Sequence, residues 1–212
     1  MDIHVIADYV CPWCYIGKRQ MEQALAESPH IAAEIRWLPF QLNPDMPKEG
    51  MPAEVFFLQH FGESRPREMQ ERVTATAEAI GLQINFDRVT HIPNTLKAHR
   101  LARLASTTHV HNLIAESLFQ ANFTDGKDIG DTEVLCQIAV NAGFDDAQVR
   151  AFLDSDHGAS EVLQEEQMVR QMGVKSVPFM VLNRQVPVSG AAGVEAFKKA
   201  LDEAAHATPA QD

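Results

Sequence analysis

Two of the three cysteines in this chain stand two residues apart, in the segment Cys11-Pro12-Trp13-Cys14. They follow a short apolar run directly and precede a segment with helical periodicity. At the first turn of a helix, backbone N–H groups and the helix dipole stabilise a thiolate, so Cys11 is expected to be the nucleophile. Cys14, one turn later, would be close enough to attack a disulfide formed at Cys11. This spacing indicates thiol–disulfide exchange.

The same two thiols would also serve as half of a zinc site, which needs two further Cys or His ligands. The chain has no second cysteine pair of this kind, and its nine histidines are scattered. We therefore predict a redox-active dithiol and no metal. The third cysteine, Cys136, lies within a helical pattern, and we expect it to be a small buried apolar residue.

The segments on either side of the motif predict a βαβ unit. Residues 3–7 and 35–40 are rich in β-branched, aromatic and other apolar residues, as strands are. Between them, Pro12 suits a first helical turn, and Lys18 with Arg19 is expected on a solvated helix face. The cysteine pair therefore lies at a strand-to-helix junction.

The rest of the chain divides into a helical block and a short β region. Helical periodicity dominates residues 55–172, where Asp131 and Asp145 are predicted N-caps. The β pattern returns as a hairpin over residues 179–188, and a final helix follows. The predicted order is βαβ, a run of helices, then ββα: one sheet-based fold interrupted by helices.

A second component of the site is Val177-Pro178, directly before the strand at residues 179–182. A proline there either begins an edge strand or forms a cis peptide bond in a tight turn. A cis bond would turn the backbone of Val177 toward whatever lies in front of the cysteines, and an extended substrate would then pair with it.

Composition limits the partners. The net charge of −11 argues against nucleic acid and against an anionic membrane surface. The N-terminus lacks the pattern of a signal peptide, and no segment has the roughly 20 apolar residues that span a bilayer. We therefore expect a cytoplasmic protein, in which a CxxC pair is more often catalytic than structural.

These motifs together resemble a known family. Cys-Pro-Trp-Cys after a first strand, a helical insertion and residues 173–179 before a hairpin resemble the DsbA family of thioredoxin-fold oxidoreductases. The segments 8–18, 94–95, 128–131 and 188–191 resemble its FrnE-like branch more closely. The resemblance covers essentially the whole chain.

The resemblance implies an α/β, thioredoxin-like fold with a large all-helical insertion. The thioredoxin-like domain would comprise residues 1–45 and 174–212, and the inserted helical domain residues 46–173. It further implies that Cys11 is the nucleophile, Cys14 the resolving thiol and Val177-Pro178 a cis bond. No cofactor would be bound, and the substrates would be protein or small-molecule thiols and disulfides, with glutathione as a possible redox partner and the protein a monomer or homodimer.

Further residues are candidates for the site, each with a structural alternative. Asp8 would relay protons to Cys14 or tune the pKa of the thiolate; equally, it would cap a loop. Trp13 and Tyr15 would form an apolar lip for a partner; burial in the core is the alternative, at least for Tyr15. Asn94 and the turn Ser189-Gly190 would shape a substrate cleft, the turn by offering N–H groups to a carboxylate; capping is the alternative for both.

Two other functions fit the same outline. Kappa-class glutathione transferases and 2-hydroxychromene-2-carboxylate isomerases have a similar layout, but they carry serine where this chain has Cys11. A redox-sensing binding protein would use the helical cleft without catalysis. The intact cysteine pair with Pro178 favours dithiol redox chemistry over both.

Overall fold

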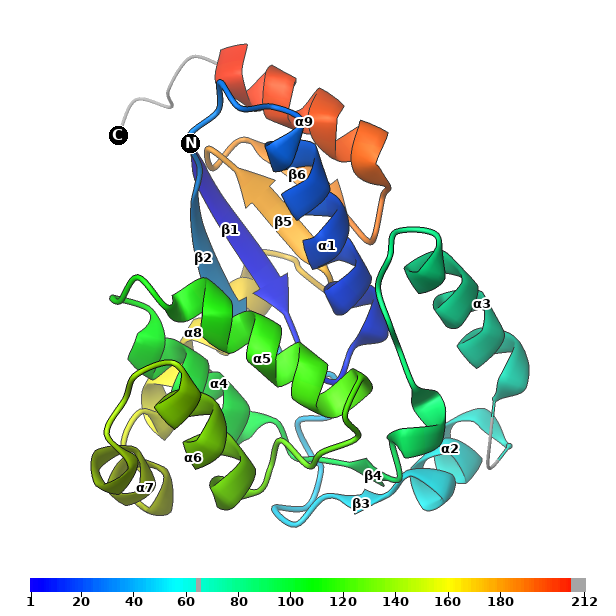
Figure 1. The fold of residues 1–212 in the computed structure, drawn as a ribbon, viewed down its shortest axis with the longest axis vertical. Helices are drawn as coiled ribbons and strands as arrows, with labels where there is room; N and C mark the ends of the chain where they lie inside the picture. The colour runs from blue at the N-terminus through cyan, green and yellow to red at the C-terminus, as the bar shows by residue number, and fades with distance from the viewer. Residues whose placement is uncertain (64–65, 207–212) are drawn as a thin grey trace.

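A four-stranded sheet lies at the centre of the computed structural model, which describes residues 1–63 and 66–206. The strand order is β2 (Glu34–Pro39), β1 (Asp2–Ala7), β5 (Phe179–Leu182) and β6 (Val186–Ser189). β1 pairs in parallel with β2 and antiparallel with β5. The two ends of the chain thus build one sheet, as Figure 1 shows, and the predicted βαβ and ββα units are confirmed.

β1 is buried on both faces over its second half, which explains the continuous apolar run in the sequence. Ile3, Val5 and Ala7 belong to the main core. Ile6 points to the other face and packs with Phe40 in a smaller apolar cluster. The strand therefore ends with apolar side chains packed against both of its faces, and the segment that carries the cysteines starts there.

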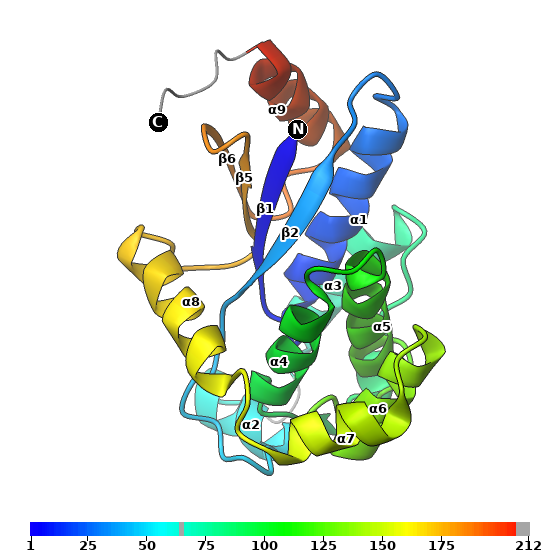
Figure 2. The same ribbon diagram turned by 90° about the vertical axis from the view of Figure 1, so that its left-hand side faces the viewer.

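Helices cover both faces of the sheet. Helix α1 (Pro12–Ala26) packs against α9 (Val194–His206), which also contacts β5 and β6. Helix α8 (Ala159–Gln171) contacts β2 and lies on the opposite side of the sheet from α1 (Figure 2). No helix in the described part of the chain is long and apolar enough to cross a membrane.

The segment between β2 and β5 is mainly helical, and its helices meet the sequence prediction closely. Its further helices are α2 (Ala53–Phe61), α3 (Arg67–Glu78), the 3-10 turn η1 (Phe86–Arg88), α4 (Leu96–Ala105), α5 (His111–Phe123), α6 (Thr132–Asn141) and α7 (Asp146–Asp154). The side chain of Asp131 accepts a hydrogen bond from the N–H of Glu133, and that of Asp145 from the N–H of Gln148. Both predicted N-caps are confirmed.

One detail of the predicted fold is wrong: the insertion is not wholly helical. β3 (Met51–Pro52) and β4 (His91–Ile92) form a two-residue antiparallel ladder within it. Two-residue segments show no alternation, and the partners lie far apart in the sequence, so local pattern does not reveal them. The division into domains 1–45 with 174–212 and 46–173 stays a prediction; α8, from the second part, nevertheless packs on the sheet of the first.

Candidate active site

Cys11 lies at the junction that the sequence predicts, between the end of β1 and the start of α1. Its N–H donates to the carbonyl of Asp8 (3.0 Å), and its own carbonyl accepts from the N–H of Cys14 (3.0 Å). Its backbone is extended, so that Pro12 becomes the first helical residue. The Cys11 side chain therefore starts at the N-terminus of α1, a position that favours negative charge.

Cys14 lies one turn into α1 and is buried to 1% exposure. Both thiols are free in the structure. Burial raises the pKa of Cys14 well above its usual range, and contact with Cys11 and the charges of Cys11 and Asp8 raise it further. Cys14 thus stays protonated when a thiolate is present at Cys11, and it needs a proton acceptor before it reacts.

The second component, Val177-Pro178, lies directly beside the first cysteine. The thiol of Cys11 donates to the carbonyl of Val177 at 3.7 Å, and the Val177–Pro178 bond is cis. Gly17 of α1 faces the proline, and a Cβ at residue 17 would lie 3.1 Å from Cγ of Pro178. Absence of a side chain at residue 17 therefore allows α1 and this loop to approach closely.

Asp8 is completely buried behind the cysteines and has a partner that the sequence did not indicate. Its Oδ1 lies 3.2 Å from Nε2 of His99, in α4. Its Oδ2 accepts from the N–H of Leu42 at 2.7 Å, so Asp8 does cap the loop after β2. The capping alternative is thus observed, while the charge of Asp8 also acts on Cys14.

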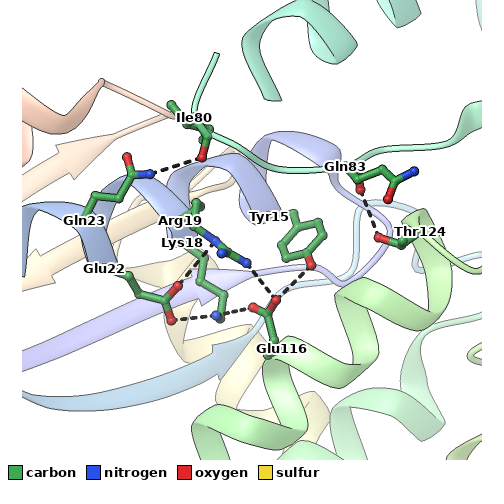
Figure 3. A network of polar contacts seen from close by, with 9 residues as sticks. All are labelled: Tyr15, Lys18, Arg19, Glu22, Gln23, Ile80, Gln83, Glu116 and Thr124. Atoms are coloured by element: carbon green, nitrogen blue, oxygen red, sulfur yellow. Dashed lines mark hydrogen bonds and ion pairs between the residues drawn. The ribbon is translucent and has the colours of Figure 1, made fainter. Parts of the chain in front are cut away.

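A polar network joins α1 to α5 (Figure 3). Tyr15 and Arg19 each donate to Glu116 at 2.9 Å, and Lys18 bonds to both Glu116 and Glu22. The prediction of a solvated face at Lys18 is wrong, because this side chain is only 3% exposed. The network fixes the orientation of the helix that carries both thiols.

An apolar cavity of about 440 Å³ opens beside Cys11. Trp13 lines it, as expected for an apolar lip, and the guanidinium of Arg72 lies 5.7 Å from the centre of the indole ring. Val177 lines it as well, so the two site components meet at this cavity. Its other described lining residues are Val10, Pro12, Leu42, Asn43, Phe56, Phe57, His60, Phe61, Met69, Phe86, Val89, Ile92, Asn122 and Phe123.

Three predicted substrate-binding residues lie outside this lining. The side chain of Asn94 donates to the carbonyl of Met46 (2.7 Å) and accepts from the N–H of Leu96 (3.0 Å), which is a capping role. Gly190 donates its N–H to the carbonyl of Pro178 (2.8 Å), and Ser189 is the last residue of β6. The structure thus places the turn behind the proline, where the Gly190 N–H already has an acceptor.

The sequence did not indicate two polar residues near the cysteines, His99 and Asn122. Each lies within an amphipathic helical pattern, where a polar residue at an apolar position is the only available signal. Cys136, in contrast, is buried in the core as predicted, and burial raises its pKa. Among residues 1–63 and 66–206, no group of three His, Cys, Asp or Glu side chains is arranged to hold a metal ion.

Comparison with known proteins gives one family match and several similar structures. Residues 2–202 match the model of the DSBA-like thioredoxin domain. A crystal structure of a probable DsbA oxidoreductase from Streptomyces coelicolor is 34% identical, with a TM-score of 0.90 over 100% of this chain and 93% of that one. An uncharacterised Bacillus subtilis protein, YwbO, is 29% identical over 95% of this chain and 96% of its own length.

A more distant structure shows the fold alone. The cytosolic disulfide reductase DsbM from Pseudomonas aeruginosa, in its structure with glutathione, is 14% identical, with a TM-score of 0.69. The alignment covers 98% of this chain and 100% of that one.

Proposed function

The chain belongs to the DSBA-like thioredoxin domain family, and from this membership and the geometry at Cys11 we propose that it is a thiol–disulfide oxidoreductase. The observation that carries the proposal is the position of Cys11 at the start of α1, with its thiol 3.7 Å from the Val177 carbonyl. A thiolate formed there gains the favourable field of the helix start.

The exchange proceeds in two steps that conserve electrons. The Cys11 thiolate attacks one sulfur of a substrate disulfide, forms a mixed disulfide and expels the first substrate thiolate. Cys14 then loses its proton, attacks the sulfur of Cys11 and expels the second substrate thiolate. The substrate gains two electrons, and the protein is left with a Cys11–Cys14 disulfide; the reverse sequence oxidises a dithiol.

Asp8 is the proton acceptor that we propose for Cys14. Its carboxylate is buried, and its charge acts on the Cys14 thiol. His99 and the N–H of Leu42 hold its two oxygens, so that the carboxylate has a defined orientation. Glutathione would serve as the general thiol that resets the dithiol, and the cytoplasm is the compartment that we propose.

The test is the redox equilibrium of the protein in glutathione buffers, followed by mass spectrometry after thiol alkylation. We expect a stoichiometric Cys11–Cys14 disulfide in the wild type and no intramolecular disulfide in Cys11→Ser or Cys14→Ser. Cys136→Ser is the matched control, since this thiol is equally buried but lies in α6. A disulfide that persists in Cys11→Ser would contradict the proposal. Glutathione transferase or isomerase activity that survives in Cys14→Ser would also contradict it.

A further inference from the structure

The cavity beside Cys11 is lined mainly by apolar side chains. Five phenylalanines line it, from α2, η1 and α5: Phe56, Phe57, Phe61, Phe86 and Phe123. Among the lining residues that the structure describes, none is an Asp, Glu, Lys or Arg. A ligand with several charges would lose its hydration there without gaining a carboxylate, ammonium or guanidinium partner from the described lining, whereas an apolar group would be stabilised by burial.

The dimensions of the site favour a small reactant. A cavity of about 440 Å³ falls within the range of about 300–1,000 Å³ that is typical of small-molecule sites. Cys11 itself is only 4% exposed. A reactant therefore reaches the thiol through the cavity, and the bulk of a folded or unfolded protein chain would have to stay outside.

Three polar side chains interrupt the apolar lining, Asn43, His60 and Asn122, and of these only Asn122 is buried. Asn122, in α5, is 3% exposed as a whole residue; its amide forms no hydrogen bond within the described residues, and its amide atoms remain in contact with solvent. A reactant that fills the cavity would displace the water that hydrates this amide, and a polar group on the reactant would have to replace the lost hydrogen bonds. Asn122 is thus positioned to bond a polar group of a molecule that fills the cavity.

We propose that the reactant at Cys11 is a low-molecular-weight thiol or disulfide whose sulfur carries an aromatic or branched aliphatic group with one hydrogen-bonding function. The apolar group would occupy the phenylalanine-lined cavity, and Asn122 would bond the polar function. This substrate class rests on the proposed function, since it needs the exchange reaction at Cys11. The substrate class adds to the proposed function that apolar reactants are preferred over highly charged ones such as glutathione.

The test uses the Cys14→Ser protein, in which the reaction stops at the mixed disulfide. Its Cys11 thiolate attacks the probe disulfide, and one probe thiolate leaves. The probes are bis(2-phenylethyl) disulfide, bis(2-hydroxyethyl) disulfide and oxidised glutathione. Each rate is divided by the rate of the same probe with free N-acetylcysteine, which removes differences between leaving thiols. We expect the phenylethyl probe to exceed both others by about tenfold or more.

Two surface positions on α2 provide a matched pair of variants. Phe61 is 52% exposed and lines the cavity, while Leu58 is 56% exposed and does not. Phe61→Ser should lower the preference for the phenylethyl probe several-fold, and Leu58→Ser should leave it unchanged. Asn122 is tested with bis(2-hydroxy-2-phenylethyl) disulfide, which carries a hydroxyl group beside each ring. The wild-type site should react faster with this probe than with bis(2-phenylethyl) disulfide, and Asn122→Leu should remove that difference in rate.

The outcomes separate this inference from the proposed function. If Cys11 reacts with no probe, the proposed function fails and the substrate class with it. If Cys11 reacts equally with all three, or if Phe61→Ser and Leu58→Ser behave alike, exchange stands and the substrate class is overturned. A higher normalised rate with a disulfide in an unfolded protein would likewise overturn it, as would an Asn122→Leu protein that keeps the wild-type selectivity.

Discussion

Oδ1 of Asp8 lies 3.2 Å from Nε2 of His99, and both side chains are almost fully buried. The pair joins the end of β1 to α4, and the ring of His99 packs against Tyr9, with ring centres 5.1 Å apart. The insertion thus supplies a partner to a carboxylate on the sheet side of the site. The reactive centre is therefore built from both parts of the chain.

Asp8→Asn is expected to slow the second exchange step by about a hundredfold, the typical effect of losing a positioned proton acceptor. The amide oxygen can still accept from the N–H of Leu42, but the negative charge is lost. Because that charge raises the pKa of Cys14, its removal would favour deprotonation, so a slower step must come from the missing acceptor. The measurement is stopped-flow release of thiol from a preformed mixed disulfide at Cys11.

The first step, measured in a Cys14→Ser background, is the control for this variant. If Asp8→Asn releases thiol as fast as the wild type does, Asp8 acts only as a cap for the loop after β2.

Glu116→Gln is expected to destabilise the fold by about 1–3 kcal/mol at pH 7, because the buried Lys18 loses one of its two carboxylate partners. Burial by itself raises the pKa of Glu116, but Lys18, Tyr15 and Arg19 outweigh it and hold that pKa below its usual range. A carboxyl group whose pKa is lowered by folding stabilises the folded state at pH values above the ordinary glutamate pKa of about 4.3. Urea unfolding at a series of pH values measures this contribution.

The difference between wild type and Glu116→Gln should shrink as the pH falls below about 4, because the carboxyl of the unfolded chain binds a proton there, and should vanish at the lower pH at which the folded carboxyl is protonated. Glu22→Gln, at a more exposed end of the same network, should cost less than about 1 kcal/mol. A difference that is independent of pH would show that the ion pairs do not produce the effect.

Arg100→Met is expected to cost about 3 kcal/mol of stability, because a buried charged donor is lost. Arg100, in α4, is 4% exposed and bonds carbonyls in the last turn of α7 and just after it, including those of Phe152 (2.6 Å) and Ser155 (2.7 Å). Arg103→Met is the control, since Arg103 is 40% exposed and pairs with Glu165 at the surface. Equal losses in the two variants, by thermal or urea unfolding, would disprove the capping role of Arg100.

The local features of the site were predictable from the sequence. Cys11 and Cys14 at a strand-to-helix junction depend on neighbouring residues alone: an apolar run before them, a proline suited to a first turn and a helical pattern after them. The helix caps at Asp131 and Asp145 were found for the same reason. The hairpin is also local: Asn183 and Arg184 both adopt positive φ, in the turn where the sequence places it.

The sequence alone thus determined the thiol pair, the strands and most helices, because short-range pattern encodes them. Only the tertiary structure decided which side chains meet. Glu116 lies 98 residues from Lys18, and His99 lies 91 residues from Asp8. Periodicity shows that a residue faces the interior, but not which distant residue it faces, since that depends on how whole helices pack. The phenylalanine-lined cavity beside Cys11 and the position of Asn122 in its wall arise in the same way.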